Sequence, residues 1–314
     1  MNASSKFAGF TVGLAAVFAL ALGAGAAFGP EDTAPADTHD TQTHDAEPGS
    51  TAGAPVAEQS TGGLMVTDSG YTLALDTAQV SAGAGVPLRF RILGADGTPV
   101  TRYVDSHDKA LHLIAVRRDM AGFQHVHPVL DAAGTWSVPL DLTRAGAYRV
   151  FADFTPAGGD GLTLGADLQV AGSYDPQPLP PAAASAVVDG YTVTLDGALT
   201  PGQASKVTLA VARGGQPVTD LQPYLGAYGH LVALRAADLG YLHVHPDGHP
   251  GDGVTPPGPG IDFVVTTPSA GDYRLFLDFQ HDGVVRTAEF TLTAGNVPRA
   301  AAPAAEPMPA GHGH

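Results

Sequence analysis

Two segments decide the fold of this chain: Leu111–Pro128, LHLIAVRRDMAGFQHVHP, and Gly229–Pro246, GHLVALRAADLGYLHVHP. In each, one His is followed 13 residues later by His-x-His-Pro, and the second segment repeats the first 118 residues further on. Each segment reads as two strand-length runs joined by a short turn that ends in Gly, which predicts a β-hairpin. We interpret the chain as a duplicated β-rich domain in which each copy carries a histidine hairpin.

The rest of the two copies repeats as well. Gly70–Asp76, GYTLALD, returns as Gly190–Asp196, GYTVTLD, and Ala145–Phe154, AGAYRVFADF, returns as Ala270–Phe279, AGDYRLFLDF. About seven short strands per copy are typical of a β-sandwich. In the first copy the strand-like runs are Tyr71–Leu75, Val86–Leu93, Leu111–Arg117, Phe123–His127, Thr135–Leu140, Ala147–Phe154 and Leu162–Val170.

A tyrosine near the end of each copy sharpens the fold prediction. Tyr148 and Tyr273 each follow a Gly at the start of the penultimate strand, where immunoglobulin-like domains carry a Tyr whose hydroxyl bonds back to the preceding corner. Val150 and Leu275 stand where an antibody domain has Cys. The pattern resembles an immunoglobulin-like (Ig-like) sandwich without the disulfide.

These patterns predict an all-β fold with two tandem Ig-like β-sandwich domains. The predicted plan is a signal peptide or membrane anchor over 1–29, a disordered stalk over 30–62, a first Ig-like domain over 63–172, a Pro-rich linker over 173–185, a second Ig-like domain over 186–295 and a disordered, His-ending tail over 296–314. Lys6 precedes the uncharged run Phe7–Phe28, which ends in small residues. Cleaved signal peptide and retained anchor both remain open, but either predicts export to the cell surface, the periplasm or the medium.

Composition excludes several classes of function. A net charge of −16 leaves no basic surface for nucleic acid. The absence of cysteine excludes thiolate metal ligands, cysteine nucleophiles and disulfides. Each domain must therefore be stable through packing alone.

The histidines of the hairpins predict metal binding. If the turn is centred between Asp119 and Met120, His112 lies opposite His127, and His125 shares their face because side chains alternate along a strand. Three imidazoles on one face suit a copper or zinc ion and leave a coordination position open. The predicted ligands are His112, His125 and His127 in the first copy and His230, His243 and His245 in the second.

A second interpretation needs no metal. The same face carries Ile114, Val116 and Phe123, so the histidines could instead be hydrogen-bonded members of a core or of the packing between domains. The chain would then be a structural or adhesive surface protein. A metal-dependent enzyme is the third alternative and ranks last, because no Asp or Glu is placed as a general base beside the histidines.

Other candidate residues carry weaker signals. Asp153 and Asp278 are expected to point outward, as solvated groups or as outer partners of a metal ligand. His107 has no counterpart in the second copy. His249 and His281 could supplement one site but are expected to be exposed loop residues. Flexible histidine pairs bind metal only weakly, and this applies to His39 and His44 in the stalk and to His312 and His314 in the tail.

Gly229–Val232, Tyr241–Pro246 and Gly271–Arg274 together resemble a group of exported bacterial proteins whose Ig-like domains carry a Gly-His…Leu-His-Val-His-Pro signature. The first copy departs from it at Leu111 and Gln124. In architecture the group is similar to the periplasmic copper-binding β-sandwiches of the CopC type. Neither likeness assigns a function. The histidine hairpins and the predicted export together predict carriage or homeostasis of copper or zinc, with a membrane metal transporter or an acceptor protein as the partner.

Overall fold

Two β-sandwiches account for residues 61–295, the part of the chain that the computed structural model describes, apart from the side chains of His243 and His245. Every regular element in this range is a strand, which confirms the all-β prediction. Within the same range, no helix is long and apolar enough to cross a membrane. The predicted signal peptide or anchor, nearly all of the stalk and the tail lie outside the described residues. The described residues belong to a single unit of the chain.

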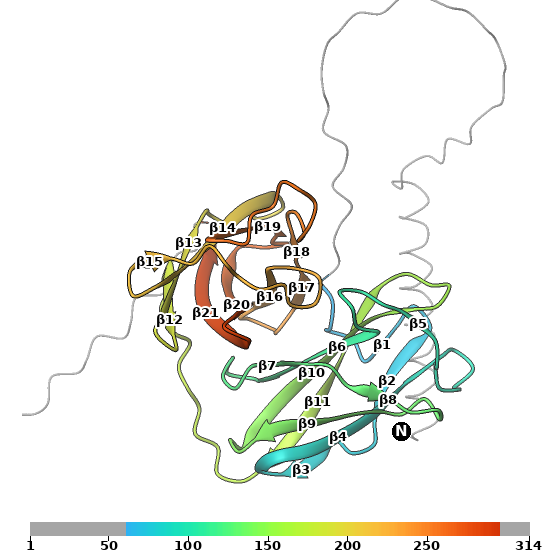
Figure 1. The fold of residues 1–314 in the computed structure, drawn as a ribbon. Coiled ribbons are helices and arrows are strands. Elements are labelled where there is room, and N and C mark those ends of the chain that lie inside the picture. Colours follow the sequence, from blue (N-terminus) through green and yellow to red (C-terminus); the bar gives the residue numbers. More distant parts are fainter. Residues whose placement is uncertain (1–60, 296–314) are drawn as a thin grey trace, which may run out of the picture. The chain divides into compact units, whose positions relative to one another are not determined.

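The first domain packs two sheets against each other (Figure 1). One has the order β1-β2-β4-β9-β8 and the other β3-β11-β10-β6-β7, with β5 paired to β10. All neighbours are antiparallel except β3 and β11. The strands are β1 (Thr67–Asp68), β2 (Tyr71–Leu75), β3 (Gln79–Ser81), β4 (Gly83–Leu93), β5 (Tyr103–Val104), β6 (Leu111–Arg117), β7 (Gln124–Val126), β8 (Val129–Leu130), β9 (Trp136–Leu142), β10 (Gly146–Pro156) and β11 (Leu162–Ala171).

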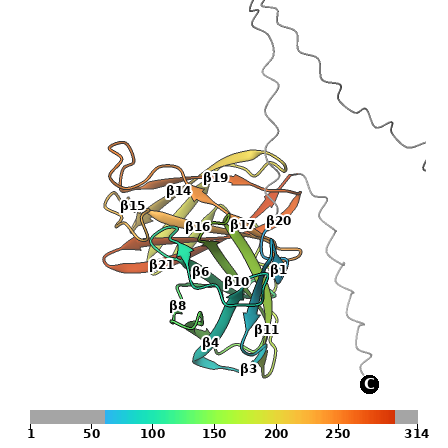
Figure 2. The same ribbon diagram turned by 90° about the vertical axis from the view of Figure 1, so that its right-hand side faces the viewer.

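The second domain repeats this plan. Its sheets have the orders β12-β13-β14-β19-β18, with β15 paired to β14, and β17-β16-β20-β21. The view in Figure 2 shows β14 beside β19, which are paired along their length. The strands are β12 (Ser185–Val188), β13 (Tyr191–Asp196), β14 (Ala204–Arg213), β15 (Gln216–Pro217), β16 (Gly229–Arg235), β17 (Tyr241–His243), β18 (His245–Pro246), β19 (Gly260–Thr266), β20 (Gly271–His281) and β21 (Val284–Ala294).

Both predicted tyrosine corners are present. The Tyr148 hydroxyl donates to the carbonyl oxygen of Arg144 at 2.8 Å, and the Tyr273 hydroxyl to that of Ser269 at 2.9 Å. Val150 is fully buried, as is Leu275 in the second copy. These positions confirm an Ig-like core that is held by apolar packing where an antibody domain has its disulfide.

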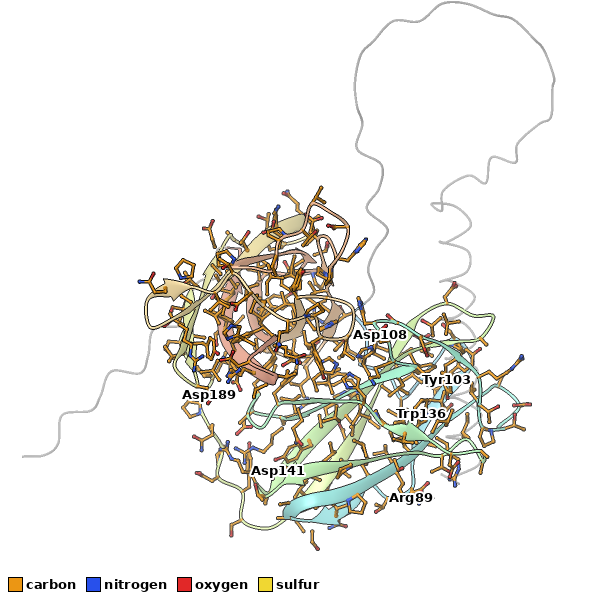
Figure 3. The ribbon with its side chains drawn as sticks, viewed as in Figure 1. Arg89, Tyr103, Asp108, Trp136, Asp141 and Asp189 are labelled. Carbon is orange, nitrogen blue, oxygen red and sulfur yellow. The ribbon has the colours of Figure 1, made fainter. Side chains whose placement is uncertain are left out.

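Trp136 and Tyr103 form an aromatic pair in the core of the first sandwich. The Trp136 indole N–H donates to the hydroxyl of Tyr103 at 3.1 Å, and the two rings meet edge to face (Figure 3). Burial raises the pKa of Tyr103 to about 12, so this hydroxyl keeps its proton. The indole nitrogen thereby has the partner that a buried Trp needs.

Burial along the strands distinguishes two kinds of sheet face. In β9, buried and exposed residues alternate, as in a strand with one face in water. In β6 every residue is buried, and in β16 all but the last. Leu113 and Ala115 face the sandwich interior, whereas Ile114 and Val116 belong to a separate apolar cluster. The outer faces of β6 and β16 must therefore be covered by something other than their own sandwich.

That cover is the other domain. The apolar cluster draws on both copies, and we call it the inter-domain core; its buried members are Ile114, Val116, Met120 and Phe151 from the first domain and Val232, Leu234, Leu239, Tyr241 and Phe276 from the second. Phe123 stacks on Phe276 with ring centroids 3.9 Å apart and planes at 4°. The face that carries the histidines is thus neither the sandwich interior nor a free surface.

The residues before β1 add a further link between the domains. Gly62 exchanges two backbone hydrogen bonds with Tyr241 of the second domain, each 3.0 Å long. Gly63 donates to the carbonyl oxygen of Thr163 in the first domain at 2.8 Å and accepts from the Arg149 guanidinium at 2.7 and 2.8 Å. We call residues 61–65 the strap. Gly62, the last residue of the predicted stalk, is thus bonded to the fold.

The linker is also attached to the first domain. Asp119 accepts a hydrogen bond from the backbone N–H of Gln177 at 2.7 Å, and Arg117 donates to the carbonyl oxygen of Asp175 at 2.9 Å. Leu179 packs against the inter-domain core. These contacts fix the path of the chain between the two sandwiches.

We expect Tyr148→Phe and Tyr273→Phe each to lower the free energy of unfolding by about 0.5–1.5 kcal/mol, the usual net contribution of one hydrogen bond. Urea unfolding followed by tryptophan fluorescence and circular dichroism measures the change. An unchanged midpoint for both variants would mean that the corner bonds do not contribute to stability.

We expect Gly165→Ala to lower the free energy of unfolding by about 1–3 kcal/mol, because overpacking forces the backbone to shift. A Cβ at this position would lie 2.0 Å from the carbonyl oxygen of Gly63, so the strap must move. Gly83→Ala is the matched control, because its Cβ would have 3.4 Å to its nearest neighbour. The control should be neutral or stabilising by up to about 1 kcal/mol in the same urea titration.

Candidate metal centre at the histidine hairpin

The hairpin of β6 and β7 has the predicted register. Leu113 pairs with Val126 and Ile114 with His125, so the next step brings His112 opposite His127. Met120 takes a left-handed backbone conformation in the turn, with φ of 66°. This register places His112, His125 and His127 on the face that turns toward the second domain.

The three imidazoles converge on one point. His112 Nδ1 lies 3.1 Å from His125 Nε2 and 3.2 Å from His127 Nε2. One ligand nitrogen from each ring lies within 4.8 Å of the other two. Three nitrogens bound tetrahedrally at 2.0–2.1 Å from one zinc ion would be about 3.3 Å apart. The observed spacing therefore fits one ion.

The outer nitrogens of two rings are already used as donors. His112 Nε2 lies 2.9 Å from the carbonyl oxygen of Ser106, and His125 Nδ1 lies 2.8 Å from a carboxylate oxygen of Asp278. A carbonyl and a carboxylate only accept, so each of these ring nitrogens carries the hydrogen. In the neutral rings, His112 Nδ1 and His125 Nε2 are then both bare lone pairs.

These two lone pairs face each other at 3.1 Å with no hydrogen between them. His127 Nε2 can donate a hydrogen to His112 Nδ1, but the lone pair of His125 Nε2 then still faces His112 Nδ1 without a donor. One proton would join two of the rings, whereas one metal ion accepts all three lone pairs at once. The arrangement also matches the usual support of metal-bound histidine, in which the second ring nitrogen donates to a carbonyl or carboxylate.

Burial keeps His112 and His127 neutral. Together with the neighbouring imidazoles, it lowers the pKa of His112 to about 4 and that of His127 to about 3. The charged form is disfavoured because a buried imidazolium loses its hydration. Neutral imidazole is the form that can bind a metal, and His112 and His127 have this form at neutral pH.

The second copy repeats part of this arrangement. His230 Nε2 lies 2.7 Å from the carbonyl oxygen of Tyr224, which matches Ser106 in the first copy, and burial lowers the pKa of His230 to about 4. The β16–β17 ladder has the predicted register, with Val232 paired to His243. The side chains of His243 and His245 lie outside the described residues.

One prediction for the second copy is wrong at the level of the backbone. His245 was expected opposite His230, but its backbone pairs with Val264 of β19, in the opposite sheet of the sandwich. In the second copy the pairing with β16 ends at His243, and the chain then crosses to the other sheet. In the first copy the pairing with β6 continues to Val126. The two hairpins are therefore not identical at their ends.

Asp278 was expected to be solvated or an outer partner of a ligand, and the solvated alternative is wrong. Its side chain is 6% exposed and bonds to His125, because the neighbouring domain covers its face. Asp153, its equivalent, accepts hydrogen bonds from Thr163 and from Tyr241 of the second domain, at 3.1 and 3.2 Å. Both carboxylates thus reach across the inter-domain contact.

The remaining candidate histidines differ in their exposure to solvent. His249 is exposed in its loop, as predicted. His281 is buried, contrary to prediction, and bonds to the Tyr191 hydroxyl at 2.7 Å and to Asp220 at 3.0 Å. The stalk and tail histidines, His39, His44, His312 and His314, lie outside the described residues.

Sequence reasoning missed that the two histidine motifs meet. The rings of His107 and His230 have centroids 5.1 Å apart, and those of His125 and His230 lie 6.4 Å apart. A signal for this was present in residues 111–116, which are all apolar or His on both faces, a pattern typical of a strand covered on both sides. It could have predicted a covered outer face, although not what covers it.

Comparison with solved structures finds matches of low identity and low TM-score. The adhesin FdeC of Escherichia coli matches at 16% identity over 72% of this chain and 64% of its own, with a TM-score of 0.24. The adhesin InvE of Yersinia pseudotuberculosis matches at 14% identity over 71% and 58%, with a TM-score of 0.22. This chain spans about three fifths of those two chains. Likeness at these scores says nothing about function.

A search of curated proteins finds no match. A family model described as a domain of unknown function, DUF8832, matches residues 65–172 and again residues 186–296. The two matches together cover more than half of the sequence. The chain therefore belongs to this family and contains two copies of its domain.

Proposed function

We propose that this chain binds a copper or zinc ion through His112, His125 and His127. The observation that carries the proposal is the contact of His112 Nδ1 with His125 Nε2 at 3.1 Å, where the outer hydrogen bonds leave both nitrogens without a hydrogen. A cation relieves the repulsion of these lone pairs, and the third ring, His127, is placed to join the same ion.

The donor set narrows the choice of metal. Imidazole nitrogens suit Cu(II) and Zn(II), whereas Cu(I) prefers sulfur ligands. The sequence has no Cys, and Met120 is 3% exposed within the inter-domain core, so its thioether serves packing. Three ligands leave a coordination position open for water or for a ligand from a partner.

Carriage or homeostasis outside the cell membrane is the role that we propose for the bound ion. It combines the predicted export of the chain with a site whose open position allows an ion to be handed on. The partner would be a membrane metal transporter or an acceptor protein. The net charge of −16 favours the approach of cations in general.

A structural or adhesive surface protein without metal is the second candidate. Two tandem Ig-like sandwiches with an extensive apolar contact suit such a role, and two of the structures with a similar fold come from proteins described as adhesins. On this view a proton shared between His125 and His112 replaces the ion, and the histidines serve only the packing between domains.

Metal analysis of the purified chain separates the two candidates. We expect the wild-type chain to retain zinc or Cu(II) after gel filtration, and His127→Ala to bind it more weakly by more than the roughly 10–100-fold that loss of an outer partner costs. His249→Ala is the matched control, because His249 is an exposed loop histidine. Equal metal content in wild type and His127→Ala would favour the structural candidate.

The ion should also stabilise the fold. An ion at about 100 times its Kd raises the free energy of unfolding by about 2.7 kcal/mol if it binds only the folded chain. Calorimetry with zinc and then with excess chelator measures this change in Tm. His127→Ala should show little response to either addition, and an equally large response in that variant would place the ion elsewhere.

A further inference from the structure

Docking of the two domains is what completes the metal centre. Its three histidines all belong to the first domain, but the carboxylate that orients His125 comes from β20 of the second. Resting on the proposed metal binding, we infer that Asp278 is the positioning residue of the centre and that ion affinity depends on the inter-domain contact.

The carboxylate of Asp278 is held in place by a hydrogen bond within its own domain. One oxygen of Asp278 accepts a hydrogen bond from the Thr287 hydroxyl at 2.6 Å, and the other accepts from His125 Nδ1 at 2.8 Å. Thr287 is the cross-strand partner of Asp278 on β21. The side chains of His125 and Asp278 are 5% and 6% exposed, so little water competes for this bond.

The apolar contact sets the register of this pair. Phe123 precedes His125 by two residues, and Phe276 precedes Asp278 by two, so in each case both residues point to the same side of their segment. The Phe123–Phe276 stack and the His125–Asp278 bond are thus successive steps of one contact between the hairpin and β20. A shift of β20 along the hairpin would break both together.

The Asp278 carboxylate sets the tautomer and the orientation of the His125 ring. The carboxylate holds the hydrogen on Nδ1, turns Nε2 toward the other two rings and raises the electron density that Nε2 offers to a cation. Without the second domain in place, His125 would lose this partner, and its ring could rotate away from His112 and His127. By linkage, ion binding must strengthen domain docking by the factor through which docking strengthens ion binding.

Competition titration of the full chain with a chromogenic zinc chelator tests the inference. We expect Asp278→Ala to raise the Kd for zinc by about 10–100-fold. Asp278→Asn keeps an acceptor oxygen but no charge, so its Kd for zinc should lie between those of wild type and Asp278→Ala. Tyr273→Phe is the matched control: it removes a partly buried hydrogen bond of the same strand without touching the centre, so its Kd should equal that of wild type.

Two further measurements separate positioning from a loss of stability. Phe276→Ala should weaken zinc binding although Phe276 touches no ligand. The double variant with Asp278→Ala should bind zinc no more weakly than Asp278→Ala alone, because each change takes the same carboxylate away from His125. The visible spectrum of bound Co(II) should show the same three-nitrogen coordination in Asp278→Asn as in wild type, since no ligand is lost.

The outcomes are distinguishable. Zinc binding that is unchanged in Asp278→Ala and Asp278→Asn would overturn the inference and leave the proposed metal site standing. Affinity that follows the unfolding midpoint across all variants, Tyr273→Phe included, would also overturn it. A wild-type chain that binds none of these ions would overturn both the inference and the proposed function.

Discussion

The inter-domain core is the contact on which the rest of this structure depends. An Ig-like sheet normally shows one face to its partner sheet and one to water, but β6 and β16 carry apolar residues on both faces. Ile114 and Val116 are fully buried only because the second domain covers them. If the domains separated, this apolar area would return to water, at a cost of about 25 cal/mol for each Å².

The chemistry of the histidines follows from the same burial. An imidazole at a water-exposed hairpin would titrate near neutral pH and find water for both nitrogens. Covered by a second domain, His112 and His127 have pKa values lowered to about 4 and 3, and their hydrogen-bonding partners must come from the protein. Burial thus keeps His112 and His127 neutral, and the ring nitrogens that face one another within the cluster carry more lone pairs than hydrogens.

Much of this structure was predictable from the sequence because the relevant signals are local. Alternation, Gly-containing turns and the repeated Gly-x-Tyr predicted the strands, both tyrosine corners and the register that brings His112 opposite His127. The bond from His125 to Asp278 was not predictable, since it joins residues from different copies. The alternation of side chains along the strand correctly predicted that Asp278 points away from its own core. That side is buried only because the first domain docks against it.

The strap gives the two-domain body an unusual point of attachment. The chain enters at residues 61–65 and bonds there to both sandwiches, through Gly62 to Tyr241 and through Gly63 to Thr163 and Arg149. A pulling force applied along the backbone at Thr61 is therefore shared between the domains before it reaches β1. Because Gly62 bonds to Tyr241 of β17, tension at this point would act on the junction of the two sandwiches as well as on the first domain.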